Sequence, residues 1–272
     1  MNIKQNLHIH TTYVDGKDTP EEIVLAAIDK GFDSIGFSEH TYTEFSDYPY
    51  QMTVTAQARY QKEVFELKEK FKDKIEIFCG LEYEMFSTVP TEGFDFLIGS
   101  VHYIDVNGKK LGFDRGVKEA EAFVRDNFGG NGMAFAKRYF ENVSLLPIYQ
   151  KFDIIGHFDI LTKTNDTLRF VDVNSKEYLN CGLEAIHALK GKIPLFEINS
   201  GAIARGYKKT PYPQTEFLKE FKNCGFGVVI TSDCHDKNFI DCYYNESKEI
   251  LIEAGFKTHF ILTGNGFVEE KL

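Results

Sequence analysis

Short apolar stretches alternate along the chain with longer stretches in which apolar residues recur at helical spacing. The short stretches are bounded by polar or turn-forming residues, which is typical of buried strands. The pattern predicts seven strands, over Ile3–His10, Asp33–Ser38, Ile75–Leu81, Phe94–Val101, Phe152–Gly156, Ile193–Ile198 and Phe226–Thr231.

Helical patterns lie between the predicted strands. Thr19 and Glu22 have the spacing of a capping box, and Pro20 occupies the first turn of a helix that we expect to end at Lys30. Further helices are expected over Tyr60–Phe71, Val117–Asn127, Met133–Gln150, Ser175–Lys190, Gln214–Asn223 and Ile240–Ala254.

Strands that alternate with helices indicate a parallel sheet built from βαβ units. Seven such units without a break in composition predict an α/β fold, with one closed or nearly closed barrel and a single domain over residues 1–272. Residues 104–132 are the least regular part. Asn107-Gly108 predicts a hairpin turn and Gly129–Gly132 a flexible loop, so this segment is either a lid or rim of a site or a solvated connector.

Composition narrows the range of partners. The net charge of −10 argues against nucleic acid, because phosphate backbones require clustered Lys and Arg, but it allows a small anionic substrate at a local cationic site. We find neither a signal-peptide pattern nor an apolar run of about 18 residues, so we expect no membrane partner. Five cysteines without a Cys-x-x-Cys pair predict free thiols and a cytoplasmic protein. The sequence makes no prediction of the oligomeric state.

Potential metal ligands follow the predicted strands. His8 and His10 are two residues apart, so in an extended segment both imidazoles point to the same face. Six of the eight histidines lie at or just after strand ends. The polar residues found there are His8, His10 and Asp15, then Glu39 and His40, then Glu82 and Glu84, His102, His157 and Asp159, Glu197 and Asn199, and finally Asp233 and His235.

In a β/α barrel, all of these positions lie at the carboxyl-terminal face, where such enzymes have their active sites. Any one member, such as His102 or His157, is by itself more typical of a hydrogen-bonded core histidine. The joint pattern indicates a metal centre. Imidazole and carboxylate ligands without cysteine suit Zn, Mn or Fe. Nine of these residues are strong candidate ligands, which is too many for one ion. They therefore predict two or three divalent ions, with a carboxylate such as Glu82 bridging. The nine are His8, His10, Asp15, His40, Glu82, His102, His157, Asp233 and His235.

The combined motifs resemble those of the PHP (polymerase and histidinol phosphatase) family over essentially the whole chain. They are His8-x-His10, Asp15, Ser38-Glu39-His40, Gly80-Leu81-Glu82, Gly99–His102, Gly156-His157 and Ser232–His235. Within the family, the chain resembles the monofunctional histidinol-phosphate phosphatases. The resemblance implies a distorted (β/α)7 barrel, a trinuclear metal centre and a role in histidine biosynthesis.

The resemblance also implies a ligand set. The first metal would be held by His8, His10, Glu82 and Asp233; the second by Glu82, His102 and His157; the third by Asp15, His40 and His235. Many relatives have His at the position of Asp15, so the third site would be weaker or would select a different ion.

Phosphate contacts are implied at Arg205 and at Lys163, where relatives often have Arg. The amine of the substrate requires a carboxylate, and Glu84, Asp114 and Asp159 are candidates near strand ends, although each is at least as typical of a solvated or capping carboxylate. We expect Asp15, Glu82, Asp233 and Arg205 to act in catalysis.

The mechanistic hypothesis is hydrolysis of L-histidinol phosphate to L-histidinol and phosphate, with a metal-bridging hydroxide attacking phosphorus in line. One alternative keeps the metal centre and changes the substrate to a nucleotide or a phosphotyrosine. Another is a non-catalytic metal-binding module, which would lack ligands, whereas this sequence has the full set.

Overall fold

The computed structural model describes residues 4–46 and 51–272. Seven parallel strands form one sheet in the order β1-β2-β3-β4-β7-β8-β9. They are β1 (Gln5–Asn6), β2 (Ser34–His40), β3 (Glu76–Glu84), β4 (Phe96–Ser100), β7 (Ile154–Ile155), β8 (Leu195–Asn199) and β9 (Gly227–Thr231). All seven predicted strands are present. The first and fifth are shorter than predicted, and Ile3 lies outside the described residues.

The sheet curves until its first and last strands meet. Asn6 in β1 donates its side-chain amide to the Ser232 hydroxyl (2.7 Å), and the main chains of Ile9 and Cys234 form an isolated parallel bridge. The result is the nearly closed α/β barrel that the strand–helix alternation predicts. Because the strands are buried on both faces, they read as continuous apolar runs.

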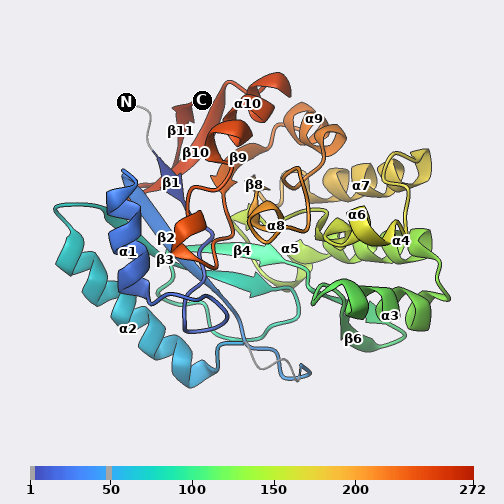
Figure 1. Ribbon diagram of the computed structural model, residues 1–272, viewed down its shortest axis with the longest axis horizontal. Coiled ribbons are helices and arrows are strands. Elements are labelled where there is room, and N and C mark those ends of the chain that lie inside the picture. Colours follow the sequence, from blue (N-terminus) through green and yellow to red (C-terminus); the bar gives the residue numbers. More distant parts are fainter. Residues whose placement is uncertain (1–3, 47–50) are drawn as a thin grey trace.

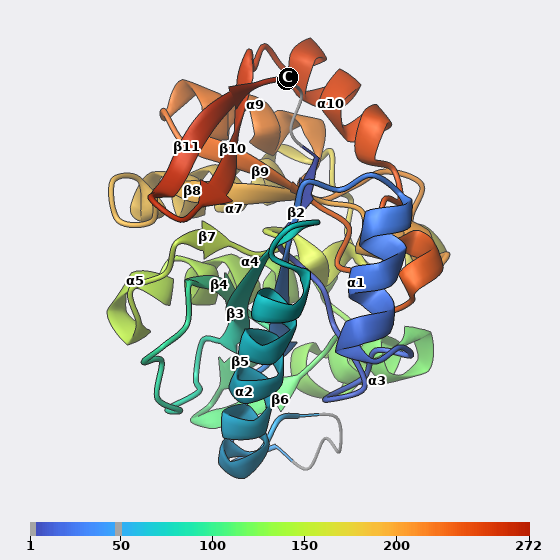
Figure 2. The same cartoon turned by 90° about the vertical axis from the view of Figure 1, so that its left-hand side faces the viewer.

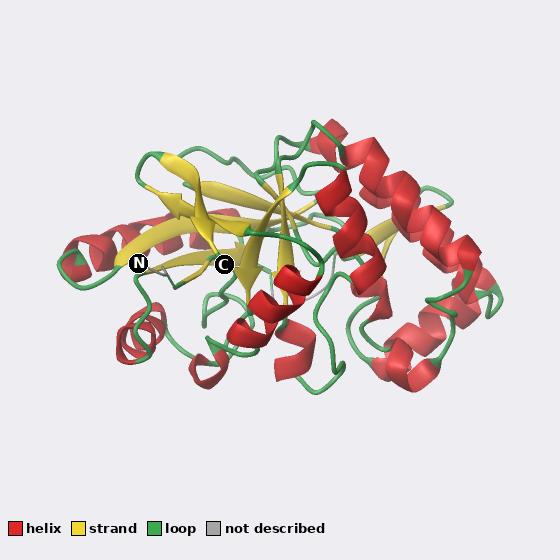
Figure 3. Cartoon of the chain, turned by 90° about the horizontal axis from the view of Figure 1, so that it is seen from above, coloured by secondary structure: helices red, strands yellow, loops and turns green. Residues whose placement is uncertain are grey.

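Helices surround the strands (Figures 1 and 3). Thr19 and Glu22 form the predicted capping box, in which each side chain bonds the main-chain N–H of the other residue. The helices are α1 (Pro20–Asp29), α2 (Val54–Phe71), α3 (Val117–Phe128), α4 (Gly132–Val143), α5 (Leu146–Tyr149), α6 (Asn165–Leu168), α7 (Lys176–Leu189), α8 (Gly201–Ala204), α9 (Thr215–Asn223) and α10 (Tyr244–Glu253).

Three helix predictions were wrong in extent. The second helix begins at Val54 instead of Tyr60, with Thr53 as its N-cap. The run Met133–Gln150 is divided into α4 and α5, because Pro147 lacks an N–H and fits only the first turn of a new helix. The last helix begins at Tyr244 instead of Ile240, since Tyr243 has a left-handed φ of 58° that no helix interior accommodates.

The irregular segment is more ordered than predicted. Its first part is the hairpin β5 (Tyr103–Val106) and β6 (Lys109–Gly112), which turns at Asn107-Gly108 with positive φ at both residues, as the sequence predicts. The Gly129–Gly132 segment is a tight connection in place of a flexible loop, because Gly129 ends α3 in a left-handed conformation and Asn131 caps α4.

A carboxyl-terminal hairpin, β10 (Thr258–Thr263) and β11 (Gly266–Lys271), was not predicted. It lies beside β9 (Figure 2). The Gln5 side chain bonds both the N–H and the C=O of Leu262, at 2.7 and 2.8 Å. Leu262 joins Leu7, Phe96 and other strand residues in one buried apolar cluster, so the hairpin closes the barrel interior.

Phe96 fills much of this interior. A Cβ at Gly80 would lie 2.4 Å from its ring, which explains why a glycine lies on the facing strand. Among the described residues, no helix is long and apolar enough to cross a membrane. All five cysteines carry free thiols.

Candidate metal centre

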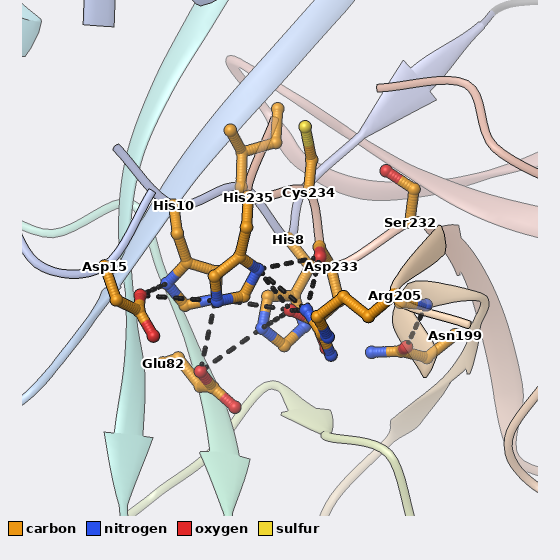
Figure 4. Close-up of polar contacts among 12 residues, drawn as sticks. His8, His10, Asp15, Glu82, Asn199, Arg205, Ser232, Asp233, Cys234 and His235 are labelled. Carbon is orange, nitrogen blue, oxygen red and sulfur yellow. Dashed lines mark hydrogen bonds and ion pairs between the residues drawn. The ribbon is translucent and has the colours of Figure 1, made fainter. Parts of the chain in front are cut away.

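Nine imidazole and carboxylate side chains converge at the carboxyl ends of the barrel strands. Figure 4 shows how His8, His10, Asp15, Glu82, Asp233 and His235 lie. They come from the loops after β1, β4, β7 and β9 and from the ends of β2 and β3. The convergence follows from the parallel order of the strands, which places every strand end at one face of the barrel. The set comprises His8, His10, Asp15, His40, Glu82, His102, His157, Asp233 and His235.

Glu82 lies at the middle of this cluster. Its carboxylate is buried and lies 2.7 Å from the nearest ring nitrogens of both His40 and His157. Burial alone would raise the pKa of Glu82, but His40 and His8 outweigh it and hold this pKa well below its usual range. Three further histidines approach within 3.4 Å of the same carboxylate: His8, His10 and His102.

The nine side chains form four overlapping groups, in each of which the ligand atoms lie within 4.8 Å of one another. The grouping differs in part from the set that the family resemblance implies: Glu82 groups with His8 and His157, and separately with His40 and His102. His10 accompanies both His8 and the group around Asp15. One ring thus faces two sets of ligand atoms.

Buried polar atoms without a hydrogen-bond partner indicate whether the cluster fits metal ions. Buried polar atoms almost always have a partner, and each orphan costs about 1–3 kcal/mol. Several buried cluster atoms have no hydrogen-bond partner, and all are lone-pair donors of the kinds that bind Zn, Mn or Fe. The cluster therefore fits divalent cations. The orphan atoms include His8 Nε2, His10 Nδ1 and Nε2, Asp15 Oδ1, Glu82 Oε2 and His157 Nδ1.

Burial and neighbouring charges set the protonation of the cluster. Burial, followed by electrostatic interaction with the neighbouring His235 and His40, lowers the pKa of His10 to about 3. Burial alone would raise the pKa of Asp15, yet His40 and His235 hold it well below its usual value. A neutral imidazole and an ionised carboxylate are the forms that bind a metal.

Asp233 is held by its main chain and by Arg205. Its φ of 45° is in the left-handed region, which Asp tolerates better than most residues. Arg205 donates from Nη1 to Oδ1 (3.2 Å) and from Nη2 to Oδ2 (2.9 Å). Space is also limited, since a Cβ at Gly201 would lie 2.6 Å from Asp233 Oδ2.

A cavity of about 230 Å³ opens onto the cluster. Its wall includes Arg205, Lys163, Glu84 and Asp114, all expected to contact substrate, and it does not include Asp159. Tyr103, Gly112, Asp114 and Arg115 of the irregular segment also border it. That segment forms part of the rim of the site, as one of its two interpretations expected.

The cavity wall already contains paired charges. Lys163 Nζ donates to the Asp114 carbonyl (2.7 Å) and lies 3.5 Å from its carboxylate. Glu84 accepts from the His102 main chain (2.9 Å), and burial raises the pKa of its carboxyl group. Asp159 is buried apart from the cavity and accepts from Gln214 N; burial raises its pKa to about 6.

Two fully buried carboxylates at strand ends, Glu39 and Glu197, were not assigned to the site from the sequence. Glu197 lies 2.9 Å from His8 Nδ1. Burial alone would raise the pKa of Glu197, but His8 lowers it. Burial raises the pKa of Glu39 to about 8. For both residues, the sequence signal of a role near the site is a carboxylate within an otherwise apolar strand.

Three further residues with ligand-type side chains, Cys234, His187 and His259, lie outside the nine-residue cluster. Cys234 points away from the cluster (Figure 4), with its Sγ directed to the Asp236 carbonyl. His187 pairs with Glu220 on the surface (2.6 Å), and the two form a separate small group with Cys224. His259 is buried in the carboxyl-terminal hairpin.

The fold and the site define a class of protein, a parallel α/β barrel with an imidazole–carboxylate cluster at its carboxyl-terminal face. The sequence matches the PHP domain family model over residues 6–201. The chain therefore belongs to the PHP family.

Similar proteins match over most of the chain. A Schizosaccharomyces pombe protein named "Probable histidinol-phosphatase" is 26% identical over 91% of this chain and 86% of its own length. The Lactococcus lactis histidinol-phosphatase is 25% identical over 98% of this chain and 97% of its own.

Solved structures share the fold. A candidate histidinol phosphatase from Listeria monocytogenes has a TM-score of 0.77 at 19% identity, covering 89% of this chain and 99% of its own. Histidinol phosphate phosphatase from Lactococcus lactis, solved with Zn, L-histidinol and phosphate, has a TM-score of 0.71 at 21% identity, covering 97% and 98%.

Proposed function

We propose that this chain is a metal-dependent phosphomonoesterase that hydrolyses L-histidinol phosphate to L-histidinol and inorganic phosphate, a step of histidine biosynthesis. The observation that carries the proposal is the cluster of nine ligand-type side chains beside a cavity lined by Arg205 and Lys163. The near full-length similarity to proteins named histidinol-phosphatase supports this substrate over other phosphate esters.

Two or three divalent ions belong to this proposal. The bound Zn in the Lactococcus lactis relative supports zinc as one candidate, and the ligand types also suit Mn and Fe. When bound, such ions lower the pKa of water towards neutrality and offset phosphate charge. The ligands in this proposal are His8, His10, Glu82 and Asp233 for one ion, Glu82, His102 and His157 for another, and Asp15, His40 and His235 for the third.

Positive side chains in the cavity bind the phosphate in this proposal. Arg205 lines the cavity, and its guanidinium has five N–H donors, of which those that do not hold Asp233 can bond phosphate oxygens. Lys163, which is paired with Asp114 in the cavity wall, supplies a single positive charge. Both cations would stabilise charge that develops on the non-bridging oxygens in the transition state.

The leaving group of histidinol phosphate carries an amine and an imidazole. Asp114 and Glu84 are carboxylates in the cavity wall that suit a cationic amine. The Glu84 Oε1 atom is buried without a hydrogen-bond partner, which supports a polar contact there. Asp159 is less suited, because it lies outside the cavity wall.

We also propose that residues 1–272 form one domain, because beyond the residues matched by the family model β9 completes the seven-stranded sheet and the hairpin of β10 and β11 packs beside β9. The partner in this proposal is a small phosphate monoester. A cytoplasmic location stays a prediction from the five cysteines.

The test is phosphate release from L-histidinol phosphate by protein purified with its metals, compared with AMP and a phosphotyrosine peptide. The metal content of the same sample is measured. We expect two or three bound ions and a strong preference for histidinol phosphate. Bound ions with faster turnover of AMP or the phosphopeptide would assign the chain to another PHP phosphoesterase. Bound ions without turnover of any of the three substrates would support the non-catalytic metal-binding module.

A further inference from the structure

Glu197, in β8, is the most heavily hydrogen-bonded carboxylate next to the candidate metal centre. The residue is fully buried, and it belongs to none of the candidate ligand groups. Four donors reach its carboxylate: His157 N at 2.6 Å, Asn199 Nδ2 at 2.8 Å, Thr231 Oγ1 at 2.8 Å and His8 Nδ1 at 2.9 Å.

These donors divide evenly between the two oxygens. Oε1 accepts from the His157 main chain and the Asn199 amide, and Oε2 accepts from Thr231 and the His8 ring. A carboxylate has about four lone-pair sites, so Glu197 is saturated. It would have to lose a hydrogen bond to bind a metal ion itself, and its contacts instead reach two neighbouring histidines.

We propose that Glu197 is a positioning residue, which holds His8 in the tautomer with hydrogen on Nδ1 and so leaves the Nε2 lone pair for a metal ion. A neutral imidazole carries one N–H, and a carboxylate at Nδ1 fixes it there. The free atom, His8 Nε2, is buried without a hydrogen-bond partner and lies 3.3 Å from Glu82 Oε2.

The same carboxylate also fixes the His157 main chain. His8, Glu82 and His157 form one candidate ligand group, and Glu197 bonds both of its histidines. It acts through the ring of one and the backbone of the other. This inference rests on the proposed metal centre, but it is independent of which phosphate ester is hydrolysed.

Replacement of Glu197 by Gln tests the tautomer directly. The His157 N–H and the Asn199 amide can only donate to the first oxygen, so the Gln carbonyl oxygen must occupy that position. The Gln NH2 group then faces His8 Nδ1, which has to become an acceptor. Thr231 can reverse its hydroxyl and accept. Glu197→Gln therefore shifts the His8 hydrogen to Nε2 and blocks metal binding there.

The experiment uses zinc-loaded wild type and Glu197→Gln, with zinc affinity measured by chelator competition. We expect one of the zinc ions of the variant, the one bound through His8, to be held about 10- to 100-fold less tightly than in wild type. The matched control is Thr231→Val, which removes another hydrogen bond to the same oxygen and leaves the His8 contact in place. Its zinc affinity should stay within about threefold of wild type. Equal losses in both variants would overturn the proposal.

Nitrogen-15 NMR of the histidine side chains separates the tautomer from a general loss of negative charge. In zinc-loaded wild type, His8 should carry hydrogen on Nδ1 and bind zinc through Nε2. In Glu197→Gln the hydrogen should move to Nε2. Weaker zinc binding with an unchanged His8 tautomer would contradict the proposal.

The wild-type spectrum decides the question even if the Gln variant does not fold, because hydrogen on Nε2 of His8 there would overturn the assignment. Wild type that binds no zinc would instead remove the metal centre. Wild type that binds zinc without hydrolysing histidinol phosphate would change the substrate and leave the role of Glu197 intact.

Discussion

Ile9 and Cys234 pair in a parallel bridge that joins the first strand segment to the last. His10 N donates to Cys234 O (2.8 Å), and Cys234 N donates to His8 O (2.9 Å). In an extended segment the neighbours of a bridging residue point to the opposite side from its own side chain. The bridge therefore places His8 and His10 next to Asp233 and His235, and closing the barrel also assembles the candidate metal centre.

Removal of metal should abolish phosphatase activity and lower stability. A cluster of buried carboxylates and imidazoles loses its compensating charge without cations, and a ligand present at a hundred times its Kd stabilises the folded state by about 2.7 kcal/mol. Dialysis against a chelator, followed by a thermal melt and a phosphate-release assay, measures both effects. Added Zn or Mn should restore both, and full activity in metal-free protein would contradict the proposed function.

Loss of a central ligand should remove metal and turnover together. His10→Ala or Asp233→Ala deletes a side chain that faces more than one ligand group or anchors the Arg205 contact. We expect fewer ions per chain and no measurable hydrolysis, checked by elemental analysis and phosphate release. Cys234→Ala is the matched control, because Cys234 lies between Asp233 and His235 and points away (Figure 4). Normal turnover in either ligand variant would exclude that residue from the site.

Arg205→Ala should mainly raise KM. The loss of a charged hydrogen bond to phosphate costs about 1–3 kcal/mol, which lowers kcat/KM about 5- to 150-fold. Arg205 also bonds Asp233, so the metal content of the variant has to be measured alongside its kinetics. Arg205→Lys keeps the charge without the two-pronged geometry and should lie between wild type and Ala. An unchanged kcat/KM in Arg205→Ala with metals retained would end the phosphate assignment.

Replacement of the carboxylate that binds the substrate amine should change the selectivity between substrates with and without an amine. Asp114→Asn or Glu84→Gln should lower kcat/KM for histidinol phosphate more than for p-nitrophenyl phosphate, which has no amine. Loss of a charge-assisted hydrogen bond to the amine should cost about 1–3 kcal/mol of binding free energy. Asp159→Asn, outside the cavity wall, should leave the ratio of the two substrates unchanged. Equal losses for both substrates would indicate a structural role.

His259 should make stability depend on pH far from the metal centre. Burial lowers its pKa from 6.5 to about 4, so between these values the unfolded chain binds a proton that the folded chain does not. The contribution of this histidine is complete above pH 6.5 and is lost as the pH falls towards 4, up to about 3 kcal/mol.

Urea unfolding of wild type and His259→Phe between pH 4 and pH 7.5 measures this contribution. The variant should lose stability less steeply on acidification than wild type. Parallel curves for wild type and His259→Phe would show that His259 is not responsible.

Much of the fold follows from local pattern. The seven strands and the capping box at Thr19 were predictable because apolar runs and cap residues act over a few positions. The division of the helix at Pro147 is encoded locally as well, because proline lacks the N–H that a helix interior requires. The carboxyl-terminal hairpin was not predicted, because its strands have mixed burial and form a two-stranded sheet of their own beside the barrel sheet.

The sequence by itself determined which side chains could form the centre, since a histidine or carboxylate at the end of a parallel strand faces one end of the barrel whatever the details. Only the tertiary structure decided how they are shared. The bridge between Ile9 and Cys234 sets residues more than two hundred positions apart side by side. The contacts of Arg205 with Asp233 and of Glu197 with His8 depend on that closure. Hydrogen bonds act over about 3 Å, and the spacing of strands along the sequence does not specify which side chains come that close.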